Sequence, residues 1–276
     1  MSWISWRSTI TRRKSDKDII MKKAFLSFDF EEFDLPKEYG VDIPLEEQIR
    51  VSAEGAERLL NILQEEQVPA TFFVTGVFAT HALQILQRLI KEGYEVASHG
   101  MRHTGMQPQD TGESKHLLEE LTGKSVYGYR QPRMMQVSDE QLRKDGYRYN
   151  ASLNPTWILG RYNHLRKPRT PFMKDQVLQV PASVTPWLRF PLFWLSTHVL
   201  PQWLYLWLVR RTLRYDGFFT SYMHPWEFYP LNEHPEWKLP RYISAYCGEA
   251  MEERMRHLIQ MLKREDASFY TLNSTL

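Results

Sequence analysis

Residues 25–34 read FLSFDFEEFD, an apolar, strand-like run that ends in a cluster of carboxylates. Side chains alternate between the two faces of a strand, so Asp29 and Glu31 share one face and Glu32 lies on the other. Two neighbouring carboxylates on one face can divide into a base and a metal ligand. We therefore expect Asp29 and Glu31 to point into a site, and Glu32 and Asp34 to face solvent or to cap the following loop.

Apolar runs of the same kind recur along the chain, with helical patterns between several of them. They lie near residues 23–29, 70–75, 94–98, 126–130, 177–180, 217–223 and 268–272. Residues 45–67 place apolar side chains along one helical face, and residues 82–93 end with Gly93 as a C-cap. Strand followed by helix, repeated in one domain, predicts parallel strands that form a closed or nearly closed α/β barrel.

The composition is that of one large domain. The chain has 276 residues, and its 42% hydrophobic content is enough to bury a single core. We expect residues 21–276 to form this domain. Residues 1–20 read as an N-terminal extension that is either disordered or precedes a true start at Met21.

The net charge and the cysteine count exclude some classes of protein. The 35 Lys and Arg residues against 33 Asp and Glu residues leave a net charge of +2, too small for a field that grips nucleic acid. The single cysteine, Cys247, excludes an internal disulfide framework. The first twenty residues hold no signal-peptide core, so we expect a cytoplasmic protein. No pattern indicates an oligomeric state.

Polar side chains follow the ends of four predicted strands. Asp29 closes the first strand, His99 follows residues 94–98, Arg130 ends 126–130, and His224 follows 217–223. In parallel α/β architectures the carboxyl ends of the strands build the active site. The sequence therefore predicts that these side chains meet at one mouth of the barrel.

His99 and His103 are four residues apart in SHGMRH, residues 98–103. If the backbone coils after the strand, both imidazoles can face one metal ion. Two histidines and one carboxylate leave coordination positions open, as a hydrolytic divalent metal requires. By itself, such a pair is more often two unrelated histidines, and the carboxylates at the neighbouring strand end favour the metal site.

Five segments in order resemble the successive motifs of the polysaccharide deacetylase family, the NodB-homology carbohydrate esterases. They are SFDFEEFD (27–34), EVASHGMRH (95–103), GYRQPRM (128–134), YNASLNPTWILGRYN (149–163) and SYMHPWEF (221–228). The resemblance covers roughly residues 24–272. It implies a distorted (β/α)₇ barrel and metal-dependent removal of acetyl groups from sugars, N-acetyl in preference to O-acetyl.

The resemblance also implies a ligand set. His99 and His103 match the metal-binding histidine pair of the family, and Glu31 stands at the position of the usual metal-binding Asp. Glu32 is the alternative ligand, because a Glu side chain reaches one methylene further than Asp. We expect the metal to be Zn²⁺.

The resemblance also implies which residues are catalytic, position by position. Asp29 matches the general base, Arg130 the arginine that holds this base, and His224 the general acid. Asn150 stands where related sequences commonly have Asp, and an amide cannot supply the charge that tunes the acid.

Two further residues are expected at the substrate. A backbone N–H near Tyr129 would hold the oxyanion, and Trp226 would form a wall of the site or a surface on which a sugar ring stacks. Glu227, in the same HPWEF segment, is expected to support the site.

Residues 185–211 are rich in aromatic side chains and end in Arg210 and Arg211. We interpret this segment either as helices that cover the barrel or form an oligomer contact, or as a peripheral contact with the inner face of a membrane. A membrane contact would suit an acetylated sugar carried on a lipid. Two alternatives to deacetylation stay open: hydrolysis of small cyclic amides on the same barrel, and a catalytically silent glycan- or membrane-binding scaffold.

Overall fold

The computed structural model describes residues 21–160 and 162–275. The predicted N-terminal extension, residues 1–20, lies outside the described residues. Among the described helices, none is both long and apolar enough to cross a membrane.

Within the described residues, nine strands form one sheet, in the order β10-β1-β2-β3-β4-β5-β9-β8, with β11 beside the start of β1. All pairs are parallel except β8 with β9. The strands are β1 (Lys23–Phe30), β2 (Thr71–Val74), β3 (Glu95–Ser98), β4 (Gly128–Tyr129), β5 (Tyr149–Asn150), β8 (Phe172–Lys174), β9 (Val177–Gln179), β10 (Phe218–Met223) and β11 (Ser268–Phe269). A separate hairpin pairs β6 (Trp157–Ile158) with β7 (Tyr162–Asn163).

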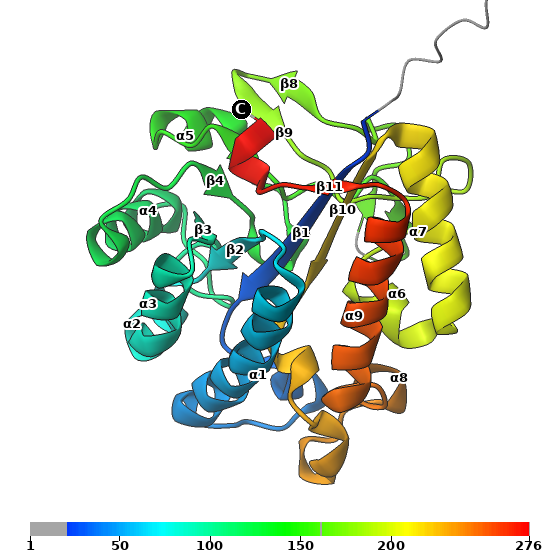
Figure 1. Ribbon diagram of the computed structural model, residues 1–276. Helices are drawn as coiled ribbons and strands as arrows, with labels where there is room; N and C mark the ends of the chain where they lie inside the picture. Colours follow the sequence, from blue (N-terminus) through cyan, green and yellow to red (C-terminus); the bar gives the residue numbers. More distant parts are fainter. Residues whose placement is uncertain (1–20, 161, 276) are drawn as a thin grey trace, which may run out of the picture.

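Helices surround the curled sheet, and Figure 1 shows α1, α9 and α7 following one another along the side of β1 and β10. They are α1 (Leu45–Glu66), α2 (Gly76–His81), α3 (Leu83–Lys91), α4 (Asp110–Thr122), α5 (Asp139–Lys144), α6 (Trp194–Val199), α7 (Gln202–Asp216), α8 (Arg241–Ser244) and α9 (Glu249–Arg264). Short 3₁₀ helices are η1 (Leu35–Tyr39), η2 (Pro132–Met134), η3 (Pro225–Phe228), η4 (Leu231–Glu233), η5 (Pro235–Trp237) and η6 (Leu272–Thr275).

β1 is the central strand, and its side chains alternate as the sequence predicts. Leu26, Phe28 and Phe30 pack in the large cluster beneath the helices, while Phe25 belongs to the smaller cluster enclosed by the sheet. Asp29 therefore faces the interior of the barrel. A strand buried on both faces explains why its sequence is almost continuously apolar.

The predicted α/β barrel is confirmed: every predicted apolar run contains a strand, and the predicted helices correspond to α1 and α3. The sequence reading missed β5, which lies between β4 and β9. β5 has only two residues, too few to show alternation. Between β9 and β10 the barrel is joined by single contacts, such as the Ser183 N–H donating to the Thr220 carbonyl at 2.9 Å.

Candidate active site

A cavity of about 280 Å³ opens at the carboxyl ends of the strands. The predicted base, metal ligands and acid all line it, together with aromatic side chains from several loops. Its lining includes Asp29, Glu31, Asp34, His99, His103, Tyr39, Phe193, Trp194, Tyr222, His224, Trp226 and Tyr242. Segments that are up to about two hundred residues apart in the sequence thus meet at this mouth, as parallel strand ends do.

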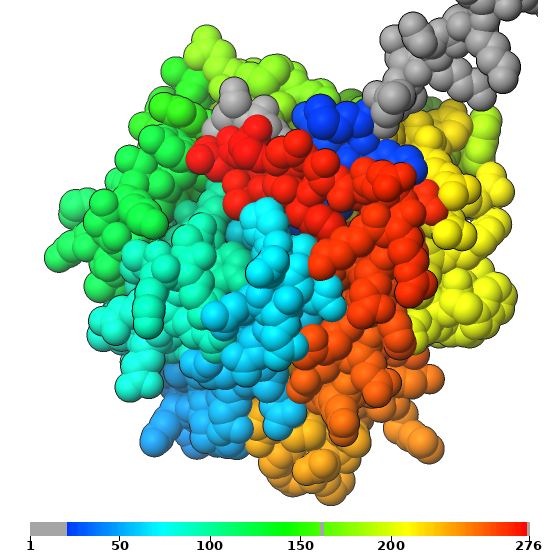
Figure 2. All heavy atoms as spheres, viewed as in Figure 1, coloured from blue at the N-terminus to red at the C-terminus, as the bar shows by residue number. Residues whose placement is uncertain are grey.

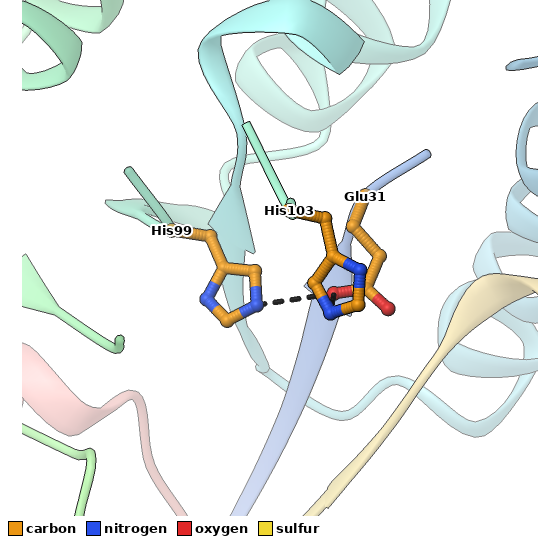
Figure 3. A group of neighbouring side chains, drawn as sticks. All are labelled: Glu31, His99 and His103. Carbon is orange, nitrogen blue, oxygen red and sulfur yellow. Dashed lines mark hydrogen bonds and ion pairs between the residues drawn. The ribbon is translucent and has the colours of Figure 1, made fainter. Parts of the chain in front are cut away.

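Glu31, His99 and His103 converge in the cavity (Figure 3). Nε2 of His99 lies 3.1 Å from Oε2 of Glu31, and Nε2 of His103 lies 3.3 Å from the same oxygen. The candidate ligand atoms are all within 4.8 Å of one another. One carboxylate and two imidazoles, with the rest of the shell open to a cavity, form a donor set that fits a catalytic divalent metal.

The outer nitrogen of each imidazole has a fixed partner. Nδ1 of His99 lies 2.8 Å from the Arg130 carbonyl oxygen, and Nδ1 of His103 lies 2.8 Å from Oδ1 of Asp34. A carbonyl or carboxylate at Nδ1 holds the proton there and leaves Nε2 free to bind metal. Asp34 is buried, so the first alternative, that it faces solvent, is wrong. It stands at the N-cap of η1 without a side-chain capping hydrogen bond, and its carboxylate pairs with His103.

Glu32 is also buried, contrary to the prediction that it faces solvent. Its Oε2 accepts a hydrogen bond from the Thr75 hydroxyl at 2.6 Å. The other oxygen lies 3.5 Å from the His103 backbone nitrogen. Burial raises the pKa of Glu32. Between the two candidates, the structure therefore places Glu31, and not Glu32, beside the imidazole nitrogens.

This arrangement predicts different effects for two matched substitutions. Glu31→Gln removes a ligand charge and should weaken Zn²⁺ binding at least about 100-fold, beyond the 10–100-fold typical of outer-shell losses. Glu32→Gln keeps an acceptor for the Thr75 hydroxyl and should weaken Zn²⁺ binding at most about tenfold. Isothermal titration of both variants with Zn²⁺ measures the difference. Greater sensitivity at Glu32 would show that the ligand has been misassigned.

Charge within the cluster of Glu31, His99 and His103 couples metal binding to pH. Burial opposes the charge of His103, but Glu31 and Asp34 outweigh it and raise the pKa of His103 to about 9. Burial likewise acts to raise the pKa of Glu31, yet His103, His224 and His99 lower it to about 2. A metal can bind His103 only after the imidazole has lost its proton.

Zn²⁺ affinity should therefore rise about tenfold per pH unit between about pH 6 and 8, because one proton leaves His103 for each metal bound. An imidazole with an ordinary pKa of about 6.5 would instead give an affinity that levels off above about pH 7. Titrations in buffers of different ionisation enthalpy measure the affinity and the proton release together. A plateau above pH 7 would contradict the raised pKa.

Asp29 is held by an immobilised arginine. Nη1 of Arg130 donates to Oδ1 of Asp29 at 2.5 Å, Nη2 donates to the Ser27 hydroxyl at 2.9 Å, and Nε donates to the Ala151 carbonyl at 3.2 Å. The guanidinium also lies over the Phe73 ring, 4.0 Å from its centroid. Oδ2 of Asp29 stays on the cavity side, 3.9 Å from Nε2 of His99.

His224 enters the cavity from the segment after β10, beside the carboxylate of Glu227. Oε1 of Glu227 lies 3.1 Å from Nδ1 of His224 and accepts from its backbone N–H at 2.6 Å. Oε2 lies 2.8 Å from Nε2 of His198. Burial disfavours the charge on His224, but Glu31 and Glu227 raise its pKa. Nε2 of His224, on the opposite side of the ring, lies 3.8 Å from Oε1 of Glu31.

Helix α1 supports the segment that carries His224. Gly55 of α1 faces η3 so closely that a Cβ there would lie 2.0 Å from the Pro225 carbonyl oxygen. Trp226, in η3, stacks on His224 with centroids 4.7 Å apart and planes at 13°, and its Nε1 lies 3.5 Å from Oε1 of Glu31. Trp226 is thus a wall of the site.

Two predicted positions lie elsewhere. The Tyr129 side chain is buried in the core beside Tyr147 and is not among the cavity-lining residues, so its side chain does not contact a substrate there. The role of its backbone N–H stays a prediction. Asn150 bonds to Asp139 and Ser152. The carboxylate beside His224 is that of Glu227.

The sequence reading assigned no role to His198, interpreted Trp194 only as a candidate membrane anchor in the aromatic segment, and did not expect Asp34 in the site. Asp34 could have been found from its place in the carboxylate cluster. His198 and Trp194 lie in α6, where the aromatic composition of the segment concealed them, and no spacing links them to His224. Trp194 lies edge-on to His224, with centroids 5.3 Å apart.

The fold and site define a single-domain α/β barrel with a candidate metal centre at the carboxyl ends of its strands. The family model for polysaccharide deacetylases matches residues 42–180, about half of the chain, and the chain belongs to this family. The matched residues include His99, His103 and Arg130.

The chain is similar to a peptidoglycan deacetylase of Helicobacter pylori, with 32% identity over 108 residues. That match covers 36% of this chain and 37% of the relative, so the chain spans little more than a third of it. Among solved structures, an allantoinase superposes with a TM-score of 0.61 at 14% identity, covering 91% of this chain and 88% of the other. A CE4 family pseudoenzyme from Bacillus anthracis gives 0.52 at 14% identity, covering 92% and 65%. These structural likenesses show the fold alone.

Proposed function

We propose that this protein is a zinc-dependent deacetylase that removes acetyl groups from a glycan. The observation that carries the proposal is the juxtaposition in one cavity of a clamped carboxylate, Asp29, with the Glu31, His99 and His103 group and with His224. Membership of the polysaccharide deacetylase family supports the same class of reaction.

Glu31, His99 and His103 would hold the metal. A divalent cation at this position supplies a Lewis acid for the acyl carbonyl and lowers the pKa of water from 15.7 to about 7. Two imidazoles with one carboxylate are typical of catalytic zinc.

Asp29 is the proposed general base. Its Oδ1 is occupied by Arg130, while Oδ2 lies on the cavity side, 3.9 Å from Nε2 of His99, and can accept a proton from water. Because the guanidinium is fixed by Ser27, Ala151 and the Phe73 ring, it holds Asp29 in one orientation.

His224 is the proposed general acid. Glu227 at Nδ1 fixes the ring and favours its protonated form, so that Nε2 can donate a proton to the departing nitrogen or oxygen of the sugar. Trp226 covers one face of the ring and restricts its rotation. The proton would therefore leave from a defined position, Nε2, on the side of the ring that faces Glu31.

The cavity favours a sugar ring as substrate. Its volume of about 280 Å³ is close to the lower end for small-molecule sites, which suits one sugar residue. Tyr39, Phe193, Trp194 and Tyr242 add aromatic surface to its walls, which suits the apolar faces of sugar rings. The amide of an N-acetyl group is the harder bond to hydrolyse, and it is for this bond that both a base and an acid are needed.

The shared fold of the allantoinase keeps hydrolysis of cyclic amides as a second candidate. An assay that measures both reactions distinguishes the two. Purified protein, stripped with chelator and reloaded with Zn²⁺, is incubated with N-acetylglucosamine oligosaccharides, with O-acetylated sugars and with allantoin. We expect metal-dependent acetate release, fastest from the N-acetylated oligosaccharides. Ring opening without acetate release would favour the second candidate, and no turnover with bound zinc would favour a silent scaffold.

A further inference from the structure

One flank of the barrel exposes large apolar side chains that the proposed reaction does not use. On α7, Trp203 is 70% exposed and Trp207 is 47% exposed. In the turn before α6, Trp187 is 75% exposed and Leu188 is 87% exposed. The Tyr215 ring lies 6.0 Å from that of Trp187 and connects the turn to the end of α7. We call these five side chains the aromatic flank.

The exposure follows from the helical period of α7. The helix packs on β10 and α9, and its buried side chains are Tyr205, Val209, Thr212 and Leu213. Trp203, Trp207 and Arg211 follow at four-residue intervals on the opposite face. The Arg211 guanidinium lies over the Trp207 ring at 5.1 Å. Figure 2 shows α7 (yellow) forming one edge of the molecule beside α9.

The ionisable side chains next to the aromatic flank carry more positive than negative charge. Lys22, Arg210 and Arg214 share one carboxylate, that of Glu265. Arg211 makes no ion pair with any residue in the described part of the chain.

The turn end of the flank is basic as well. The Arg189 guanidinium donates to the Lys167 carbonyl at 2.7 Å, which brings a second exposed basic segment, residues 166–167, beside Trp187 and Leu188. Both groups of basic side chains therefore lie towards the C-terminal end of α7, where Tyr215 meets Trp187.

We propose that the aromatic flank docks this protein on the surface of an anionic lipid bilayer. Tryptophan and tyrosine side chains suit the interface between headgroups and acyl chains, and the surrounding arginines suit acidic headgroups. Trp187 and Leu188 are adjacent in a tight turn, closed by the Thr185 N–H donating to the Phe190 carbonyl at 2.9 Å. Such a turn can insert two large apolar side chains at once.

Charge argues against a second copy of this chain as the occupant. A two-fold symmetric contact places the same surface on both sides and would bring like-charged arginines together. In the sequence, the turn and α7 lie on either side of α6, whose Trp194 lines the active-site cavity. For the function proposed above, docking would favour an acetylated sugar carried on a lipid. The docking proposal does not depend on that function. Vesicle binding is measured without substrate, so its result is independent of whether the protein removes acetyl groups.

Co-sedimentation with vesicles tests the proposal. The wild-type protein should bind vesicles of phosphatidylcholine with phosphatidylglycerol, bind phosphatidylcholine alone much less, and release as salt is raised. The Trp203→Ser/Trp207→Ser and Trp187→Ser/Leu188→Ser variants should each lose at least about tenfold in partitioning, because inserted apolar surface is removed. Arg211→Glu should weaken binding to the anionic vesicles alone.

Matched controls lie on other faces. Leu83→Ser, at the start of α3, removes another exposed apolar side chain, and Lys124→Glu reverses another exposed charge. Both should bind like the wild type, and thermal unfolding confirms that all variants are folded. Absence of wild-type binding, unchanged binding in both double variants, or equal loss in the controls overturns the proposal. So does binding of an RNA oligonucleotide in place of vesicles, or a dimer that the double variants abolish.

Discussion

Asp29→Asn is expected to reduce acetate release about 10²–10⁴-fold while leaving the metal bound. The amide has nearly the same size as the carboxylate and can still accept a hydrogen bond from Arg130, so the surroundings should hold their shape. It cannot take a proton from water at neutral pH. Because Asp29 lies on the Arg130 side and outside the ligand group, the loss should fall on turnover and not on metal content.

His99→Ala and His103→Ala are the matched comparison for Asp29→Asn. Each removes an imidazole of the ligand group, and each should lose both zinc and activity. Metal content by mass spectrometry and acetate release by a coupled assay give the two quantities for each variant. Equal loss of zinc in all three variants would contradict the division between base and ligands.

His224→Ala is expected to have the second large effect, and its size should depend on the leaving group. An amine leaves only when it is protonated, so release of acetate from an N-acetyl sugar should fall about 10²–10⁴-fold. The nitrophenolate of 4-nitrophenyl acetate leaves without a proton, and its hydrolysis should change much less. The ratio of the two rates reports the acid function separately from folding.

Glu227→Gln supplies the control for that ratio. The amide keeps a partner at Nδ1 of His224 but removes the negative charge that favours the protonated ring. The N-acetyl reaction should fall by less than in His224→Ala, and the ester reaction should stay near the wild-type rate. If His224→Ala slows both substrates equally, His224 is not the group that protonates the leaving nitrogen.

The barrel and the positions of the site residues could be predicted because both depend on strand ends. β1 is apolar on both faces, so its boundary is visible, and alternation from Phe28 onward places Asp29 and Glu31 on the inner face. His99, Arg130 and His224 each come directly after a strand. Their separation in sequence does not matter, since parallel strands bring these ends to one mouth.

Contacts made by loops could not be predicted in the same way. Asp34 pairs with His103 because the chain after β1 turns back over the mouth, and no periodicity encodes that turn. Glu32 was expected to face solvent or to cap the following loop, yet the Thr75 hydroxyl, just before α2, donates a buried hydrogen bond to it. His198 reaches Glu227 from a helix that the sequence could describe only as aromatic.

The most direct test of the central claim is a crystal structure of the zinc-loaded protein, with anomalous diffraction measured at the zinc edge. We predict a single strong peak within about 2.0–2.2 Å of one Glu31 oxygen and of Nε2 of both His99 and His103. Asp29 should still be paired with Arg130 and should lie outside bonding distance of the metal. A peak bonded to Asp29, Glu32 or Asp34 in place of Glu31, or no peak in the cavity, would contradict the account.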